Sequence, residues 1–81
     1  MVRITFYSKD GCWLCDTARE MLNGQAERHD LRITNIDITS SDELYETYRF
    51  DIPVLEFADG STLHGHIRKT HLMRKFDDNR D

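Results

Sequence analysis

The sequence Lys-Asp-Gly-Cys-Trp-Leu-Cys-Asp at residues 9–16 contains both cysteines of the chain, Cys12 and Cys15. The alternation of apolar and polar residues over 2–7 predicts a strand before it, and the apolar spacing over 13–23 predicts a helix after it. Side chains three residues apart on a helix are neighbours, with Cβ atoms roughly 5–6 Å apart. Because a disulfide needs a similar separation, this pair can close and open with little backbone movement.

A Cys-x-x-Cys pair at the start of a helix favours redox chemistry. The first helical turn has unpaired N–H groups and a partial positive charge, which stabilise a thiolate, and the thiolate is the nucleophile. Cys12 lies nearest the helix start, so we predict that it is the more exposed, attacking thiol and that the less exposed Cys15 resolves the mixed disulfide. Zinc ligation is less favoured because zinc normally needs four ligands. A structural disulfide is less favoured because so small a loop removes little chain entropy.

The length and composition of the chain limit the functions that it can have. The 81 residues predict a single domain, 1–81, without room for a large substrate cavity. A formal charge of −4 argues against nucleic-acid binding, and the low mean hydropathy of −0.66 argues against a membrane partner. No charged-then-apolar leader is visible, so we expect the protein to be located in the cytoplasm. In that reducing compartment, paired cysteines are more often catalytic than structural.

The rest of the chain predicts an α/β fold with the order β-α-β-α-β-β-α, a four-stranded mixed sheet with three helices. The expected later elements are a strand, a short helix, a hairpin and a terminal helix, over residues 31–37, 40–48, 54–64 and 67–77. We expect the first helix to stop at Asn23-Gly24, Ser40 or its close alternative Ser41 to cap the second, and residues 79–81 to be frayed.

Two polar residues stand in the strand that should be central. Arg3 and Thr5 would point to one face of the sheet, which is unusual for a sheet covered by helices on both faces. Because the second helix is short, we expect part of this face to be open.

Two motifs carry a resemblance to a known family. Phe6-Tyr7-Ser8-Lys9-x-x-Cys12-x-x-Cys15, and later Ile52-Pro53-Val54-Leu55 with Asp59-Gly60, resemble glutaredoxins and their small glutaredoxin-like relatives of the thioredoxin fold. The resemblance implies a thiol–disulfide oxidoreductase in which Lys9 meets the carboxylate of glutathione. It further implies that Pro53 is a cis proline facing the cysteines and that the backbone of Ile52 pairs with an extended substrate. Trp13 is either a hydrophobic contact for that substrate or packed on the domain's own surface.

The partners implied are a disulfide-containing protein or a small thiol substrate, and a reductase or glutathione as electron donor. We expect a monomer with no permanently bound cofactor. Residues 63–69 read Leu-His-Gly-His-Ile-Arg-Lys, where glutaredoxins usually carry a Gly-Gly pair and then Asp to hold glutathione. The alternatives are a glutathione-dependent [2Fe–2S] cluster carrier and a redox-inert interaction module. His64, His66 and His71 are interpreted as surface side chains rather than metal ligands.

Overall fold

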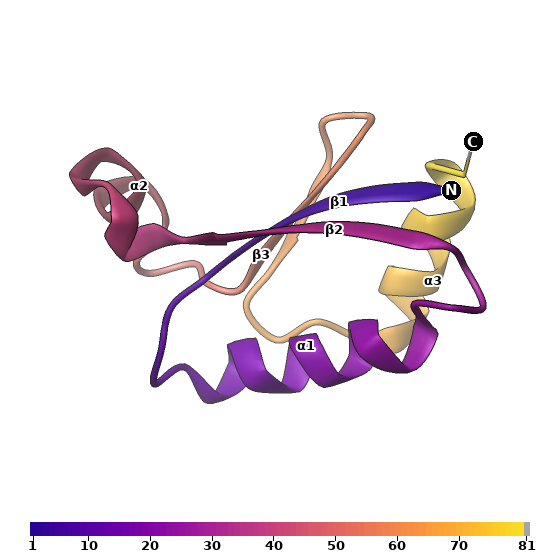
Figure 1. Cartoon of the computed structure of the whole chain (residues 1–81), viewed down its shortest axis with the longest axis horizontal. Coiled ribbons are helices and arrows are strands. Elements are labelled where there is room, and N and C mark those ends of the chain that lie inside the picture. Colours follow the sequence, from indigo (N-terminus) through magenta and orange to yellow (C-terminus); the bar gives the residue numbers. More distant parts are fainter. Residues whose placement is uncertain (81) are drawn as a thin grey trace.

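The computed structural model describes residues 1–80 and contains one four-stranded mixed sheet with the strand order β2-β1-β3-β4. Strand β1 pairs in parallel with β2 and antiparallel with β3, which in turn pairs antiparallel with β4 (Figure 1). The bounds of the strands are β1 Val2–Ser8, β2 Leu31–Asp37, β3 Val54–Phe57 and β4 Thr62–His64. The predicted order of elements and the mixed sheet are confirmed.

The two longer helices pack on one face of this sheet. The helices are α1 Trp13–Gln25, α2 Asp42–Tyr48 and α3 Lys69–Asp78, with a short 3-10 helix, η1, at Ile38–Ser40. The inward side chains of β1 form one buried cluster with apolar residues of α1 and α3, in which Phe6, Leu22 and Phe76 are almost fully buried. The alternation of β1 therefore places its apolar side chains between the sheet and both helices.

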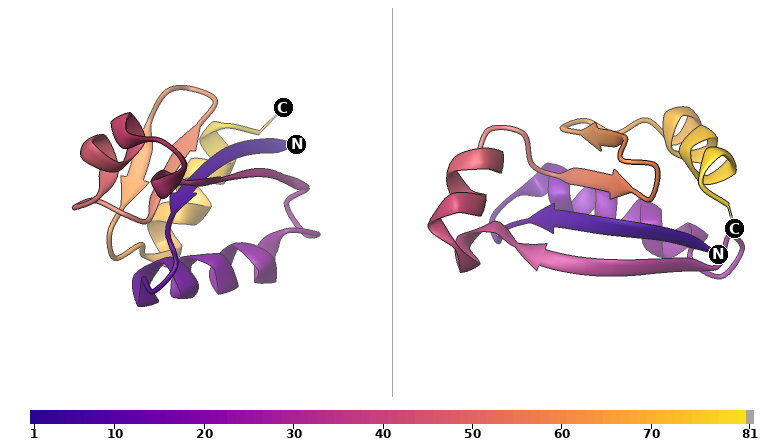
Figure 2. Two further views of the ribbon diagram at one scale, coloured as in Figure 1. Left: turned by 60° about the vertical axis from the view of Figure 1, so that its left-hand side comes forward. Right: turned by 90° about the horizontal axis from the view of Figure 1, so that it is seen from above.

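The short helix α2 covers only one end of the opposite face, as the two views in Figure 2 show. Leu44, Tyr45 and Tyr48 pack against a second cluster formed by Tyr7, Ile38 and Val54. The rings of Tyr7 and Tyr48 are stacked with their centroids 4.4 Å apart. Arg3 is exposed and Thr5 is half-buried on this face, so the expectation that part of it is open is confirmed.

The end of α1 differs from the prediction. The helix passes the expected stop at Asn23-Gly24 and reaches Gln25, and the positive φ of 48° falls at Asp30 instead. Ala26 at the end of the helix packs against the core, and its N–H donates to the carbonyl of Asn23. Extending the helix therefore buries apolar surface that an earlier stop would leave in water.

The structure distinguishes between the two residues predicted to cap α2, Ser40 and Ser41. Ser41, the alternative, is the cap, because its Oγ accepts a hydrogen bond from the N–H of Leu44 at 3.0 Å. Ser40 is instead the last residue of η1, which begins after the cap residue Asp37. The side chain of Asp37 satisfies the first turn of η1, so the chain turns once more before α2 starts.

The terminal helix begins two residues later than predicted and ends in an ordered residue. Asn79 is buried, its amide donates to the carbonyl of Lys75, and its Oδ1 accepts from the N–H of Asp59 at 3.0 Å. The prediction that this end is frayed was therefore wrong for Asn79, because a contact with the β3–β4 turn holds it. Asp81 lies outside the described residues.

Candidate redox site

Cys12 is the N-cap residue, directly before the first residue of α1. Its backbone is extended, with φ −106° and ψ 103°, and its Sγ accepts a hydrogen bond from the N–H of Cys15 at 3.1 Å. The preceding Gly11 has a positive φ of 78°, a conformation that glycine adopts without steric cost, and this lets the loop after β1 turn into the helix. One of the unpaired N–H groups of the first turn is thus directed at the sulfur.

The two cysteines are joined by a disulfide, with their Cα atoms 5.2 Å apart. Cys15 is fully buried and Cys12 is half-buried, so Cys12 is the more accessible of the two cysteines. The buried stripe of α1 runs through Cys15, Ala18 and Leu22, and Leu14 is only half-buried. The sequence analysis had predicted that this stripe begins at Leu14. The buried stripe begins one residue later, so the cysteine and not the leucine faces the core.

The side chain of Arg19 contacts both the start of α1 and the end of β1. Its Nη2 donates to Oγ of Ser8 at 3.3 Å, and its Nη1 forms an ion pair with Asp16 at 3.0 Å. The guanidinium also lies 5.2 Å from the centre of the Phe6 ring. These contacts connect two consecutive elements across the cysteine loop, and they fix where the redox pair stands relative to the sheet.

Strand register brings Pro53 to the same end of the sheet as the cysteine loop. Tyr7 is the partner of Val54 in the antiparallel β1–β3 pair, so the residues that follow and precede them, Ser8 and Pro53, are adjacent positions at this end. The Ile52–Pro53 peptide bond is cis, as the resemblance implies, Pro53 is fully buried and Ile52 is half-buried. The N–H of Gly65 donates to the carbonyls of Asp51 and Pro53 at 3.1 and 3.0 Å, which ties this loop to the end of β4.

Lys9 is half-buried in the loop between β1 and α1. Hydrogen bonds from the hydroxyl and N–H of Thr39 hold the pKa of Asp37 below its usual value, and the positive charge of Lys9 lowers it further. The ammonium group of Lys9 therefore acts on a carboxylate at the end of β2. Its predicted contact with a substrate carboxylate stays a prediction.

Two large apolar side chains are exposed on the described surface, one inside the Cys-x-x-Cys motif and one three residues before Pro53. Trp13 is 72% exposed and Phe50 is 84% exposed. Trp13 follows Cys12 directly and does not pack on the domain's own surface, which was one of the two alternatives for it. Phe50 was missed by the sequence analysis, although an aromatic residue in a polar stretch three positions before Pro53 was a usable signal. The guanidinium of Arg49 covers one side of its ring at 4.5 Å.

The three neighbouring histidines do not form a cluster of ligands. His64, His66 and His71 are all exposed. Among residues 1–80, no group of three or more His, Cys, Asp or Glu side chains is placed to hold a metal ion. Within the same range, no helix is both long and apolar enough to cross a membrane.

A Cys-x-x-Cys pair between the first strand and helix, with a cis proline at the same end of the sheet, defines a dithiol site on a thioredoxin fold. The structure is similar to a structural genomics target protein from X. campestris, at 29% identity over 93% of this chain and 96% of that one, with a TM-score of 0.79. It is also similar to a mutant thioredoxin from Halobacterium salinarum, at 22% identity over 99% of this chain and 75% of that one, with a TM-score of 0.77.

A solution structure of a protein from Nitrosomonas europaea shares the fold as well, at 19% identity over 90% of this chain and 87% of that one, with a TM-score of 0.72. The family described as "Glutaredoxin-like domain (DUF836)" matches residues 3–77. The chain belongs to this family, and its cysteine pair fits thiol–disulfide chemistry.

Proposed function

We propose that this protein is a dithiol–disulfide oxidoreductase that reduces a disulfide in a protein or a glutathione-linked substrate. The observation that carries the proposal is the asymmetry of the pair: Cys12 is only half-buried at the helix start and its Sγ accepts a hydrogen bond from the N–H of Cys15, whereas Cys15 is fully buried within disulfide reach. An accessible sulfur next to a helical N–H is suited to attack, and a buried neighbour is suited to resolve.

The reaction proceeds in two exchanges that balance. The Cys12 thiolate attacks one sulfur of the substrate disulfide, a new bond forms between these sulfurs, and the other substrate sulfur leaves as a thiolate that takes up a proton. The Cys15 thiol then loses its proton and attacks the Cys12 sulfur, which releases the second substrate thiol. Two electrons and two protons pass from the dithiol to the substrate, and the protein is left with the Cys12–Cys15 disulfide.

An external donor must reduce that disulfide again, and the chain's own contacts favour a dithiol reductase over glutathione. The N–H of Gly65 is already used by the carbonyls of Asp51 and Pro53. The region after β4 also lacks one glycine and the acid that glutaredoxins use. We therefore propose a dithiol reductase as the electron donor, with glutathione as the second candidate, and protein disulfides as the principal substrates.

The test is a redox titration of the purified protein against a glutathione buffer, in which alkylation and mass measurement count the free thiols. The expected result is a single reversible two-electron transition of the Cys12–Cys15 pair. A pair that oxidises irreversibly or not at all would refute the proposal. A glutathione-coupled assay beside one driven by a protein dithiol donor identifies the donor, and anaerobic reconstitution with iron and sulfide tests the cluster-carrier alternative.

A further inference from the structure

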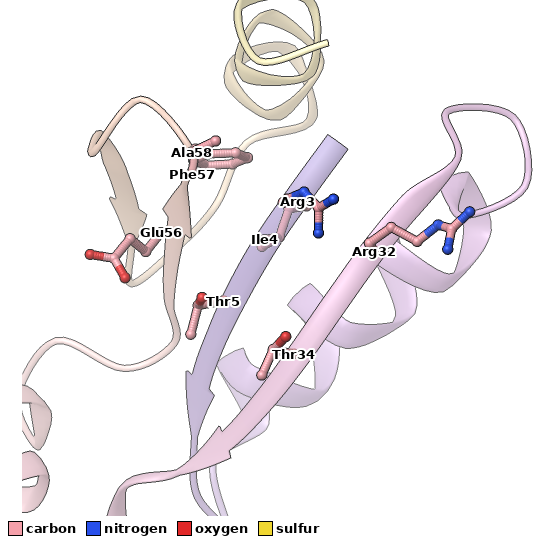
Figure 3. A pocket seen from close by; sticks show the side chains of 8 residues that line it. All are labelled: Arg3, Ile4, Thr5, Arg32, Thr34, Glu56, Phe57 and Ala58. Carbon is pink, nitrogen blue, oxygen red and sulfur yellow. The ribbon is translucent and has the colours of Figure 1, made fainter. Parts of the chain in front are cut away.

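The open face of the sheet carries a polar cavity that the redox chemistry does not use. The cavity has a volume of about 270 Å³ and lies over the first half of β1, on the face opposite to α1 and α3. Figure 3 shows the side chains that line it, which come from β1, β2, β3 and the residue after β3: Arg3, Ile4, Thr5, Arg32, Thr34, Glu56, Phe57 and Ala58.

Two arginines line this cavity from neighbouring strands. Arg3 of β1 and Arg32 of β2 are register partners in the parallel pair, and neighbouring strands lie roughly 4.7–4.9 Å apart. Arg32 forms an ion pair with Asp30 at 3.2 Å, whereas Arg3 has no ion-pair partner among residues 1–80. Like charges on neighbouring strands are unfavourable for the sheet. The repulsion is relieved when an anion lies between the two guanidiniums.

The next row of the sheet adds neutral donors. Thr5 and Thr34 are also register partners, and their hydroxyl groups line the same cavity beside the arginines (Figure 3). The one carboxylate of the cavity, Glu56, accepts a hydrogen bond from the hydroxyl of Tyr7 at 3.2 Å. In Figure 3 this carboxylate points away from the arginines. The positive side of the cavity is therefore separate from its negative side.

We propose that this cavity binds the phosphoryl group of a small organic phosphate. A phosphate monoester has three terminal oxygens and close to two negative charges near neutral pH, which match two guanidiniums and a threonine hydroxyl together, whereas a carboxylate carries only one charge. A volume of about 270 Å³ leaves room for a small organic part next to the phosphoryl group. The Glu56 end of the cavity suits a hydroxyl or amine donor on that part. The site lies on the other face of the sheet from α1 and is independent of the redox cycle.

The test is an NMR titration of the oxidised, isotope-labelled protein with glycerol 3-phosphate and, separately, with inorganic phosphate, at constant ionic strength set with sodium chloride. The expected result is a set of amide shift changes confined to residues 3–5, 32–34 and 56–58, with a dissociation constant of about 1–10 mM. Glycerol 3-phosphate binding several-fold more tightly assigns the site to an organic phosphate. Equal affinities contradict the organic part of the proposal and leave a site for free phosphate.

The variant that decides is Arg3→Gln, since Arg3 has no other ion pair to lose within the described chain. It is expected to weaken glycerol 3-phosphate binding by about tenfold. Arg28→Gln is the matched control, because Arg28 is exposed in the turn after α1 and its loss changes net charge equally. It should leave the affinity within about twofold. If both variants weaken binding alike, or if the shifts spread over the basic residues of α3, the attraction is nonspecific and the proposal is wrong.

A second measurement does not depend on binding. Without ligand, Arg3→Gln should unfold at the same temperature as the unmodified protein or at a higher one, because the repulsion from Arg32 is gone. A lower unfolding temperature would mean that Arg3 stabilises the sheet, and the argument from like charges would fail. The redox pair stays closed in all of these experiments, so their outcome is separate from that of the proposed oxidoreductase activity.

Discussion

Trp13 offers a direct test of how a protein substrate would approach the cysteines. The side chain is 72% exposed and follows Cys12 in the chain, so a docked substrate could cover it without any rearrangement of the fold. If a substrate covers half of the exposed surface, it removes roughly 80 Å² from water, which is worth ~2 kcal/mol at about 25 cal/mol per Å². Trp13→Ala should then lower kcat/KM for a protein disulfide by about 30-fold.

The assay compares two substrates with dithiothreitol as the common reductant. Reduction of insulin disulfides reports on a protein substrate, and reduction of hydroxyethyl disulfide reports on a substrate too small to reach the indole and Cys12 together. The expected result is a large loss for insulin and a loss of less than about threefold for the small disulfide, because only the former loses an apolar contact.

Two controls separate docking from folding and from chemistry. Trp13→Phe keeps most of the apolar surface and should recover most of the rate. Thermal unfolding of Trp13→Ala should differ little from that of the unmodified protein, within about 0.5 kcal/mol, since an exposed side chain contributes little to stability. An unchanged kcat/KM for insulin in Trp13→Ala would refute the docking role. An equal loss on both substrates would place the effect on the cysteine chemistry instead.

Three further predictions follow from particular contacts. Cys15→Ser should accumulate a mixed disulfide between Cys12 and a protein substrate, visible on a non-reducing gel, and Cys12→Ser should show none; trapping by both would contradict the assigned roles. Asn79→Ala should lower the free energy of unfolding by about 1–3 kcal/mol in urea, because two part-buried hydrogen bonds of a buried side chain are lost, whereas Asn23→Ala on the exposed face of α1 should change it by less than about 0.5 kcal/mol. Burial, followed by interactions with Tyr48 and Glu56, raises the pKa of Tyr7 from 10.0 to about 12, so the folded state holds its proton longer than the unfolded chain. Stability should therefore fall by roughly 2–3 kcal/mol as the pH rises from about 10 to about 12, and a Tyr7→Phe variant that fell equally would contradict this.

Much of the site could be predicted from local sequence. The alternation in β1, the loop to Cys12 and the start of α1 depend on neighbours within a few residues, and the structure has all three where the sequence indicated. The hairpin of β3 and β4 is also local, because the turn at 58–61 joins two strands that follow one another. These elements are set by the periods of strand and helix and by turn chemistry. The dithiol was therefore visible before any tertiary contact was known.

The positions that sequence misjudged depend on partners far along the chain. Asn79 was expected to fray, but it is held by the N–H of Asp59, twenty residues earlier. Leu14 was expected to lead the buried stripe, but the face of α1 that packs on the sheet begins with Cys15. No local pattern encodes such contacts, because burial is a property of the surface that another element brings.

Sequence by itself thus determined that the chain has a Cys-x-x-Cys pair on a strand–helix junction of a glutaredoxin-like fold. Only the tertiary structure decided that Phe50 stands exposed before the cis proline and that Arg3 and Arg32 are neighbours in the sheet. The last of these pairs residues 29 positions apart in number, through the parallel register of β1 and β2. Parallel strands meet only after a crossover has closed, so the proximity of the two charges follows from the packing of α1 against the sheet and from no feature of either strand alone.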